Sequence, residues 1–374
     1  MVMGPSAGLI LADLGAEVIK VEPLAGDNTR RLKGSGAGYF PMYNRNKKSI
    51  CVDLKSDEGL TFVYKLLDSA DIMIENFRPG AMDKLGLGYE DCAALNERLI
   101  YCSLKGFLSG PYEHRTALDE VTQMMGGLAY MTGLPDKPMR AGASVVDVSG
   151  GMFGVIGILS AVEQRHTTGK GQYLTSSLFE STVFLMGQHM AQEAVTGTAP
   201  PPMSQRNSAW AIYDIFVTKD DEKIFVAVVS DTLWRGFCEE FGFSDWAQDE
   251  GLASNNGRVE AREKLLPIVA ATFGKLSKKK LLQKLDKIGL PYAPINTPSD
   301  LFTDEHLLDG GLLELELTDG SKVALPGIPV EFSGKRLPAR HNPPQAGEHF
   351  AEIAKDLGLS EEEIDSLKVG GLVK

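Results

Sequence analysis

Cysteine, histidine and the common catalytic signatures are scarce in this chain of 374 residues. Its four cysteines, at positions 51, 92, 102 and 238, show no CxxC spacing, which argues against a zinc knuckle or a disulfide framework. The six histidines show no metal-ligand spacing either. The motifs GxxxxGK(S/T) and HExxH, typical of P-loop phosphate transfer and zinc proteolysis, are absent. We also expect no hydrolase-type serine catalysis.

Positive charge is in deficit, with 38 lysines and arginines against 50 aspartates and glutamates and a net charge of −12. This balance excludes a general binder of nucleic acids or of anionic membranes. We expect no apolar run of the roughly 20 residues that span a bilayer. The first residues, 1–5, lack the basic and apolar regions of a signal peptide. The sequence therefore predicts a cytoplasmic protein without a nucleic-acid or membrane partner.

Short apolar runs alternate with longer helical stretches up to about residue 190. A helix is expected over 59–69, where Ser56 provides a cap and the first turn is acidic. The alternation predicts an α/β fold with a doubly wound, mostly parallel sheet and ligands at the carboxyl ends of its strands. The expected strands are 16–22, 49–54, 71–77 and 98–105.

A linker rich in proline, residues 196–202, precedes a change in the pattern of apolar and polar residues. Two apolar runs, 211–217 and 223–229, flank a polar turn and predict an antiparallel hairpin, which helical stretches follow. Short strands return from about residue 313. We therefore divide the chain into a large α/β domain, a small α+β domain and a C-terminal part. Their boundaries are 1–195, 205–312 and 313–374.

Asp147 stands before a nearly uncharged, glycine-rich helix expected over 148–164. One interpretation makes Asp147 the N-cap of this helix, a role that aspartate often fills and that the pattern alone favours. The other makes it a carboxylate nucleophile, held ionised by the helix dipole and exposed N–H groups. Neighbouring glycines would then let a substrate approach the backbone closely, as such a nucleophile requires.

Basic residues at 45–48 precede the expected strand 49–54, which ends beside Lys55, and Arg78 and Lys84 follow the expected strand 71–77. In an acidic protein, cations at one end of a sheet indicate an anion site, most naturally for phosphates. Scattered solvated charges are the alternative. Arg140, shortly before Asp147, also has two interpretations: it holds the second carboxylate of a dicarboxylate substrate, or it forms a surface salt bridge.

Several stretches of the chain have a characteristic sequence, order and spacing over nearly the first 190 residues. They are 4–22, 44–54, 75–80, 98–107, the segment around Asp147 and 168–172. Together they resemble the class III CoA-transferases. This superfamily includes formyl-CoA transferase, acetyl-CoA:oxalate CoA-transferase and α-methylacyl-CoA racemase. The later domain is similar to the family more loosely.

The resemblance implies that Asp147 is the nucleophile and that coenzyme A enters as acyl-CoA, with no metal or redox cofactor. It implies a Rossmann-like large domain built from both chain ends, so that 313–374 returns to it, and an interlocked homodimer. It also implies a set of CoA contacts, namely Lys55, Asn76, Phe77, Arg78, Lys84, Thr116, Ala117, Leu118 and Asp119.

The chain departs from the family pattern in three places. A strand that usually precedes Gly4 is not in this sequence. Leu118 stands where the racemases have a catalytic histidine, and a leucine cannot exchange an α-proton. A mobile glycine-rich lid is not found, and 202–206 occupies that part of the chain.

The resemblance predicts an acyl-CoA:carboxylate CoA-transferase that works through mixed-anhydride and aspartyl-CoA thioester intermediates. Both intermediates hydrolyse, so the site must exclude water. Two alternatives stay open at this point: an acyl-CoA racemase, isomerase or hydratase on the same scaffold, and a non-catalytic CoA-binding subunit.

Overall fold

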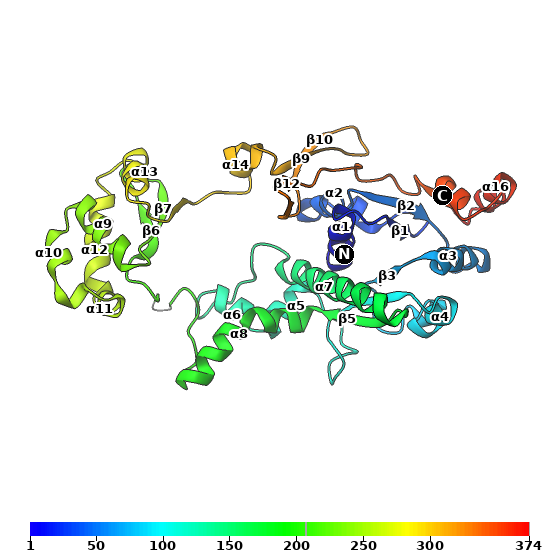
Figure 1. Ribbon diagram of the computed structural model, residues 1–374, viewed down its shortest axis with the longest axis horizontal. Helices are drawn as coiled ribbons and strands as arrows, with labels where there is room; N and C mark the ends of the chain where they lie inside the picture. The colour runs from blue at the N-terminus through cyan, green and yellow to red at the C-terminus, as the bar shows by residue number, and fades with distance from the viewer. Residues whose placement is uncertain (206–207, 374) are drawn as a thin grey trace. The chain divides into compact units, whose positions relative to one another are not determined.

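The computed structural model describes residues 1–205 and 208–373. By its internal contacts the chain divides into two units (Figure 1). Unit 1 comprises Met1–Gln205 and His306–Lys374, and unit 2 comprises Arg206–Glu305. The sequence placed these boundaries at 195, 205 and 312. Unit 1 is therefore assembled from both ends of the chain.

The parallel strands of unit 1 form two sheets rather than the single sheet predicted. Strand β1 (Val18–Glu22) pairs with β2 (Lys47–Cys51), whereas β3 (Ile72–Glu75), β4 (Ile100–Lys105) and β5 (Tyr173–Ser177) form a second sheet in that order. β1 and β3 are each an edge, because no described strand lies between them. Helix α1 (Met3–Asp13) contacts both sheets.

Helices cover these sheets and build one of the unit's two cores. Ser56 accepts a hydrogen bond from the Gly59 N–H at 3.0 Å and caps α3 (Asp57–Ser69), as the sequence predicted. The C-terminal segment returns to this core, where the Phe350 and Phe62 rings are 5.0 Å apart. It contains α15 (Phe350–Asp356) and α16 (Glu361–Val369). A capping box at Ser360 begins α16. The remaining elements of unit 1 include α2 (Tyr39–Tyr43), α4 (Tyr89–Leu95), α5 (Asp119–Met125), α6 (Leu128–Thr132), α14 (Glu305–Leu308), β9 (Leu312–Glu316), β10 (Lys322–Pro326), β11 (Glu331–Phe332) and β12 (Lys335–Arg336).

Glycines on α7 (Val145–Thr168) let α1 and β4 approach it closely. A Cβ on Gly151 would lie 2.4 Å from the Ser6 hydroxyl, and one on Gly154 would lie 2.9 Å from Leu104. Helix α7 and the helix that follows β5 are nevertheless only partly buried. Ile156 of α7 is 56% exposed, and Phe184 of α8 (Leu178–Thr196) is 71% exposed.

Helix α7 is also long and apolar enough to cross a membrane, the one such helix in the described part of the chain. The expectation that no segment reaches this length was therefore wrong. Core helices pass the same test of length and composition, and α7 packs against α1, β4 and β5.

Unit 2 is a small α+β unit. The predicted hairpin is present as β6 (Tyr213–Val217) and β7 (Lys223–Ala227), and β8 (Tyr292–Pro294) extends it on the β7 side. Its core is rich in aromatic rings, with Phe237 and Phe273 fully buried. Its helices are α9 (Asp231–Phe241), α10 (Ser244–Gln248), α11 (Asn255–Glu260), α12 (Arg262–Phe273) and α13 (Lys278–Lys287).

Candidate active site

The amino ends of α1 and α7 meet at the carboxyl ends of β3 and β4. The Gly4 N–H donates to Asn76 Oδ1 at 3.2 Å, directly after β3. Asn76 Nδ2 in turn donates to the Leu104 carbonyl at 2.9 Å, near the end of β4. Asn76 thus joins the start of α1 to both strand ends. A polar site at the carboxyl edge of the sheet is what the α/β pattern predicts.

Asp147 lies at this junction, in the first turn of α7. It is not the N-cap: Ser144 holds that position and makes no capping side-chain bond. The Asp147 carboxylate instead accepts a hydrogen bond from the backbone N–H of Met3 in α1. The N-cap interpretation was therefore wrong, because the side chain points to another helix and not to its own.

Burial raises the pKa of Asp147 from its ordinary value of 3.8 to about 6. The Asp119 carboxylate also contributes to this rise, whereas the N-terminal ammonium group, the Met3 N–H and Arg140 oppose it, and the value of about 6 is the net result. The side chain is half-buried. Asp147 is therefore ionised at neutral pH, yet it is more basic than an exposed aspartate.

The predicted contacts for CoA fall into three groups. Phe77, Arg78 and Lys84 follow β3 and are exposed, and Lys55 follows β2 in the other sheet. Lys55, Arg78 and Lys84 form no ion pair with a described residue, so their charges are available to an anion. Asn76 has the structural bonds described above.

The third group, residues 116–119, follows β4 and ends with Asp119, the first residue of α5. Leu118 is 60% exposed, whereas Asp119 is buried, with 8% exposure. Asp119 Oδ2 accepts hydrogen bonds from the backbone N–H groups of Val146 and Asp147, both at 3.0 Å. The sequence did not lead us to predict that Asp119 binds the first turn of α7. The local pattern that could have indicated a fixed carboxylate is the spacing of Asp119 and Gln123, which lie one helical turn apart.

A second buried carboxylate fixes the loop after β3. Glu75 Oε1 lies 2.6 Å from Lys105 Nζ and accepts the Ser103 hydroxyl at 2.5 Å. Lys105 Nζ also donates to the Phe77 carbonyl at 2.9 Å. These bonds hold the backbone of Phe77 in place while its ring, 56% exposed, faces outward.

Arg140 is engaged by its neighbours. Its Nη1 donates to Glu120 at 2.7 Å, and its other nitrogens donate to the carbonyls of Ala141 and Ala143. Of the two interpretations of Arg140, the structure shows the salt bridge.

The candidate lid segment is tied to α6. The Met203 N–H donates to the Met131 carbonyl and the Ser204 hydroxyl to the Gly133 carbonyl, both at 2.9 Å. Arg206, the last residue of that segment, lies outside the described residues.

Other potential nucleophiles are poorly placed. Residues 4–8 match the GxSxG spacing, but Ser6 lies within α1, is 2% exposed and donates its hydroxyl to the Met3 carbonyl. Burial raises the pKa of the Cys92 thiol to about 11 and that of Cys102 to about 12. Neither is a thiolate at neutral pH. Within residues 1–205 and 208–373, no group of three or more histidine, cysteine, aspartate or glutamate side chains is placed to hold a metal ion.

Known proteins are similar to this chain over nearly its whole length. The chain is 33% identical to succinyl-CoA:glutarate CoA-transferase of Mus musculus, over 99% of this chain and 87% of that protein. It is 34% identical to succinate–glutarate CoA-transferase of Agrobacterium fabrum strain C58, over 95% and 92%. A crystal structure of a CAIB/BAIF family protein from Brucella suis superposes with a TM-score of 0.82 at 35% identity, covering 95% of this chain and 96% of that one.

The model of CoA-transferase family III matches residues 1–350. The chain therefore belongs to CoA-transferase family III, which confirms the resemblance inferred from the sequence. It is an enzyme with transferase activity, of a family that uses CoA thioesters as co-substrates.

Proposed function

We propose that this protein is an acyl-CoA:carboxylate CoA-transferase whose nucleophile is Asp147. One observation carries the proposal: the Asp147 carboxylate stands where the amino ends of α1 and α7 meet and does not cap its own helix. Its raised pKa makes it a better nucleophile than an exposed aspartate, and it is still ionised at neutral pH.

The first half of the reaction moves CoA from the donor acid to Asp147. A carboxylate oxygen of Asp147 attacks the thioester carbonyl, the C–S bond breaks, and CoA leaves as the thiolate. The thiolate then attacks Cγ of Asp147 in the mixed anhydride and releases the donor acid as its carboxylate. Asp147 is now a thioester of CoA.

The second half repeats these steps with the acceptor. The acceptor carboxylate attacks Cγ of the aspartyl thioester and expels CoA thiolate, which attacks the acceptor's acyl carbon and frees the Asp147 carboxylate. Each tetrahedral step develops negative charge on oxygen. Helix amino ends stabilise such charge through their free N–H groups and dipoles.

We assign the CoA phosphates to the cations that follow β2 and β3, namely Lys55, Arg78 and Lys84. Their charges have no partner among the described residues, and they are exposed. The exposed Phe77 ring, on a backbone fixed by Lys105, offers a stacking face for the adenine base. Residues 116–119 are assigned to CoA by the resemblance alone.

We propose a dicarboxylic acid as acceptor, because two relatives that match nearly the whole chain are named for succinate or succinyl-CoA and glutarate. Leu118 argues against racemisation on this scaffold, because it offers no group that exchanges a proton. The cytoplasmic location stays a prediction from the sequence.

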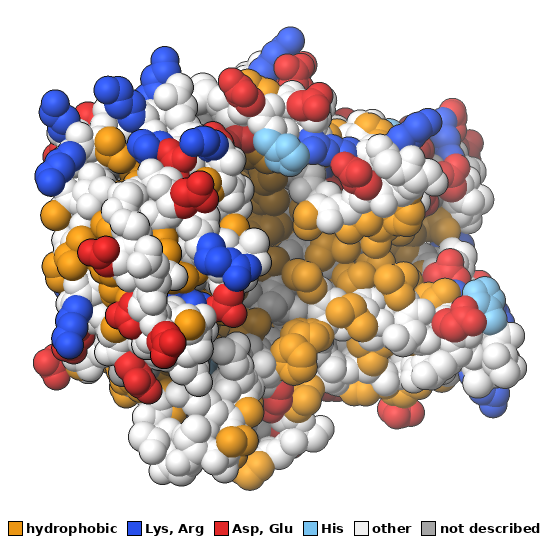
Figure 2. Space-filling model, turned by 60° about the vertical axis from the view of Figure 1, so that its left-hand side comes forward, with side chains coloured by type: hydrophobic (Ala, Val, Ile, Leu, Met, Phe, Trp, Pro, Cys, Tyr) orange, Lys and Arg blue, Asp and Glu red, His pale blue; other side chains and the backbone are white. Residues whose placement is uncertain are grey.

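We further propose that two chains form the homodimer implied by the resemblance. Figure 2 shows many hydrophobic side chains on the visible surface, among charged ones. Helices α7 and α8 expose many large apolar side chains, and an exposed group of apolar side chains marks an interaction site. Its members include Met152, Ile156, Leu159, Phe184, Leu185 and Met190.

The test of the mechanism is trapping of the aspartyl thioester. Wild-type protein incubated with succinyl-CoA is expected to carry a CoA adduct at Asp147 by peptide mass spectrometry, and hydroxylamine is expected to remove it. Asp147→Ala should lose both the adduct and transfer to glutarate, whereas Asp136→Ala, at an exposed position in the loop between α6 and α7, should keep both. Undiminished transfer by Asp147→Ala would overturn the assignment.

A further inference from the structure

The amino end of α7 is capped by a side chain from a different helix. The first N–H groups of a helix lack partners within it, and a cap usually comes from the preceding residue. Ser144 does not supply one here. The two hydrogen bonds from Val146 N and Asp147 N to Asp119 Oδ2 do so instead, at 3.0 Å each, from a residue 28 positions before Asp147.

Asp119 is itself held in place by buried bonds. Its Oδ1 accepts from Gln123 Nε2 at 2.5 Å, one turn along α5, and Gln123 is fully buried. The side-chain oxygen Oε1 of Gln123 accepts from the Ala141 N–H at 2.8 Å, and Arg140 Nη2 lies 3.6 Å from Asp119 Oδ1. The cap therefore connects α5, the segment before α7 and α7 itself through side chains with little freedom to move.

We propose that Asp119 is a positioning residue for the Asp147 nucleophile: it holds the backbone of Asp147 and satisfies the first turn of α7, so that the Asp147 carboxylate is left for the acyl group. This role rests on the proposed function of Asp147. It differs from the CoA contact that the resemblance implies, because Asp119 Oδ2 is used by two backbone N–H groups and the side chain is buried.

The charge of Asp119 adds a second effect. The groups that act on the Asp147 carboxylate are the N-terminal ammonium group, Asp119 from α5 and Arg140 from the loop before α7. Tyr43 of α2 also faces it, because the Asp147 charge contributes to the raised pKa of that phenol. Asp119 is the one carboxylate among these groups, and it raises the pKa of Asp147.

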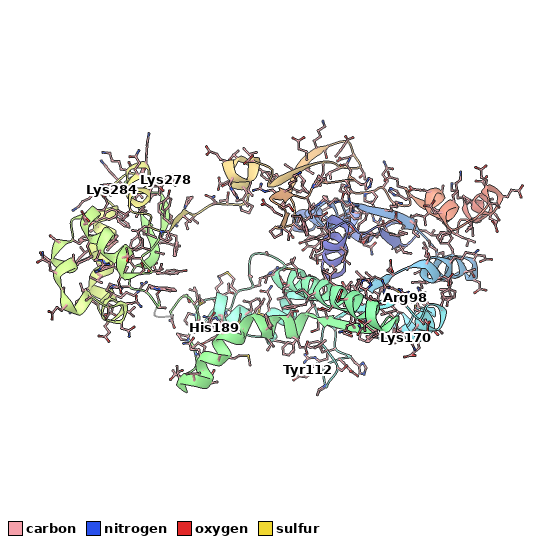
Figure 3. All side chains as sticks on the ribbon, viewed as in Figure 1. Arg98, Tyr112, Lys170, His189, Lys278 and Lys284 are labelled. Carbon is pink, nitrogen blue, oxygen red and sulfur yellow. The ribbon has the colours of Figure 1, made fainter. Side chains whose placement is uncertain are left out.

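The first test is independent of the reaction. In the full-length protein, Asp119→Ala should speed amide hydrogen exchange in peptides covering 144–150 by about tenfold, since the first turn loses two bonds. Asp220→Asn is the matched control, because Asp220 accepts the Lys278 N–H at 2.9 Å and so caps α13 from outside that helix. Lys278 is the first residue of α13 (Figure 3). That variant should speed exchange near residue 278 and leave 144–150 unchanged. Unchanged exchange at 144–150 in Asp119→Ala would overturn the proposal.

The second test is kinetic, with succinyl-CoA and glutarate. Asp119→Ala should lower kcat at least tenfold with KM for succinyl-CoA within threefold. Asp119→Asn keeps an oxygen acceptor, so its kcat should fall less, and the acid limb of its pH profile should move to lower pH because the like charge is gone. A raised KM with unchanged kcat, or an unmoved acid limb in Asp119→Asn, would contradict the role. If wild-type protein forms no adduct at Asp147, the proposed function fails, and the exchange measurement alone decides whether Asp119 holds this turn.

Discussion

Replacing the nucleophile should stabilise the protein while abolishing its activity. In Asp147→Asn the side chain keeps an oxygen that can accept the Met3 N–H but loses the charge that burial disfavours. The pKa of Asp147 is about 6 in the folded state against 3.8 ordinarily, and each unit is worth about 1.4 kcal/mol. Ionised Asp147 therefore destabilises the fold by up to about 3 kcal/mol at pH 8.

The sign of the pH dependence follows from the same shift. A carboxyl with a raised folded-state pKa stabilises the fold when protonated, and that contribution is lost as pH rises through 6. The variant should therefore gain most over wild type at pH 8 and progressively less as pH falls from 6 towards 4. A change of 1 kcal/mol moves the melting temperature of a large domain by about 2 °C, so a gain of several degrees is expected at pH 8.

Calorimetry at pH 5, 6, 7 and 8 measures this gain and separates transitions of the two units. Asp136→Asn, at an exposed position, is the control and should shift the melting temperature little at any of these pH values. A gain that is equal at pH 5 and pH 8, or no gain at pH 8, would show that Asp147 does not carry a costly buried charge.

Three further outcomes follow from the site. The acylation rate should fall about tenfold per pH unit below pH 6, measured by single-turnover adduct formation, and a rate independent of pH down to 5 would argue against an ionised Asp147 nucleophile. Arg78→Ala and Lys84→Ala should each raise KM for acyl-CoA several-fold with little change in kcat, and the effect should weaken in high salt. Lys170→Ala is the control for both variants, because Lys170 lies near Arg98, before β5 (Figure 3). An equal rise of KM in Lys170→Ala would remove the assignment of Arg78 and Lys84 to the CoA phosphates. Gly151→Ala should destabilise unit 1 by about 1–3 kcal/mol in urea unfolding, because its Cβ would meet Ser6 at 2.4 Å, and a neutral result would show that α1 is free to move away.

Local pattern was sufficient to predict several elements. Ser56 followed by an acidic turn predicted the start of α3, and two apolar runs around a polar turn predicted the hairpin of unit 2. The nearly uncharged, glycine-rich stretch predicted a helix, and α1 packs closely against the helix observed there. These features depend on neighbours within a few residues, which the sequence displays directly.

The role of Asp147 illustrates the opposite case. Its local pattern favoured an N-cap, because an aspartate before an apolar helix commonly has that role. The carboxylate that caps α7 belongs to Asp119, a residue of another helix. No rule based on sequence spacing predicts a hydrogen bond between Asp119 and Val146. The partition of the strands into two sheets and the exposed face of α8 are likewise set by contacts distant in sequence.

The sequence by itself determined the α/β class, the family and the identity of one candidate nucleophile, since these depend on periodicity and on residue types in a fixed order. Only the tertiary structure decided what that carboxylate is free to do. Its pKa, its bond to α1 and its release from capping all arise from groups that folding brings within a few ångströms, where burial and charge act most strongly.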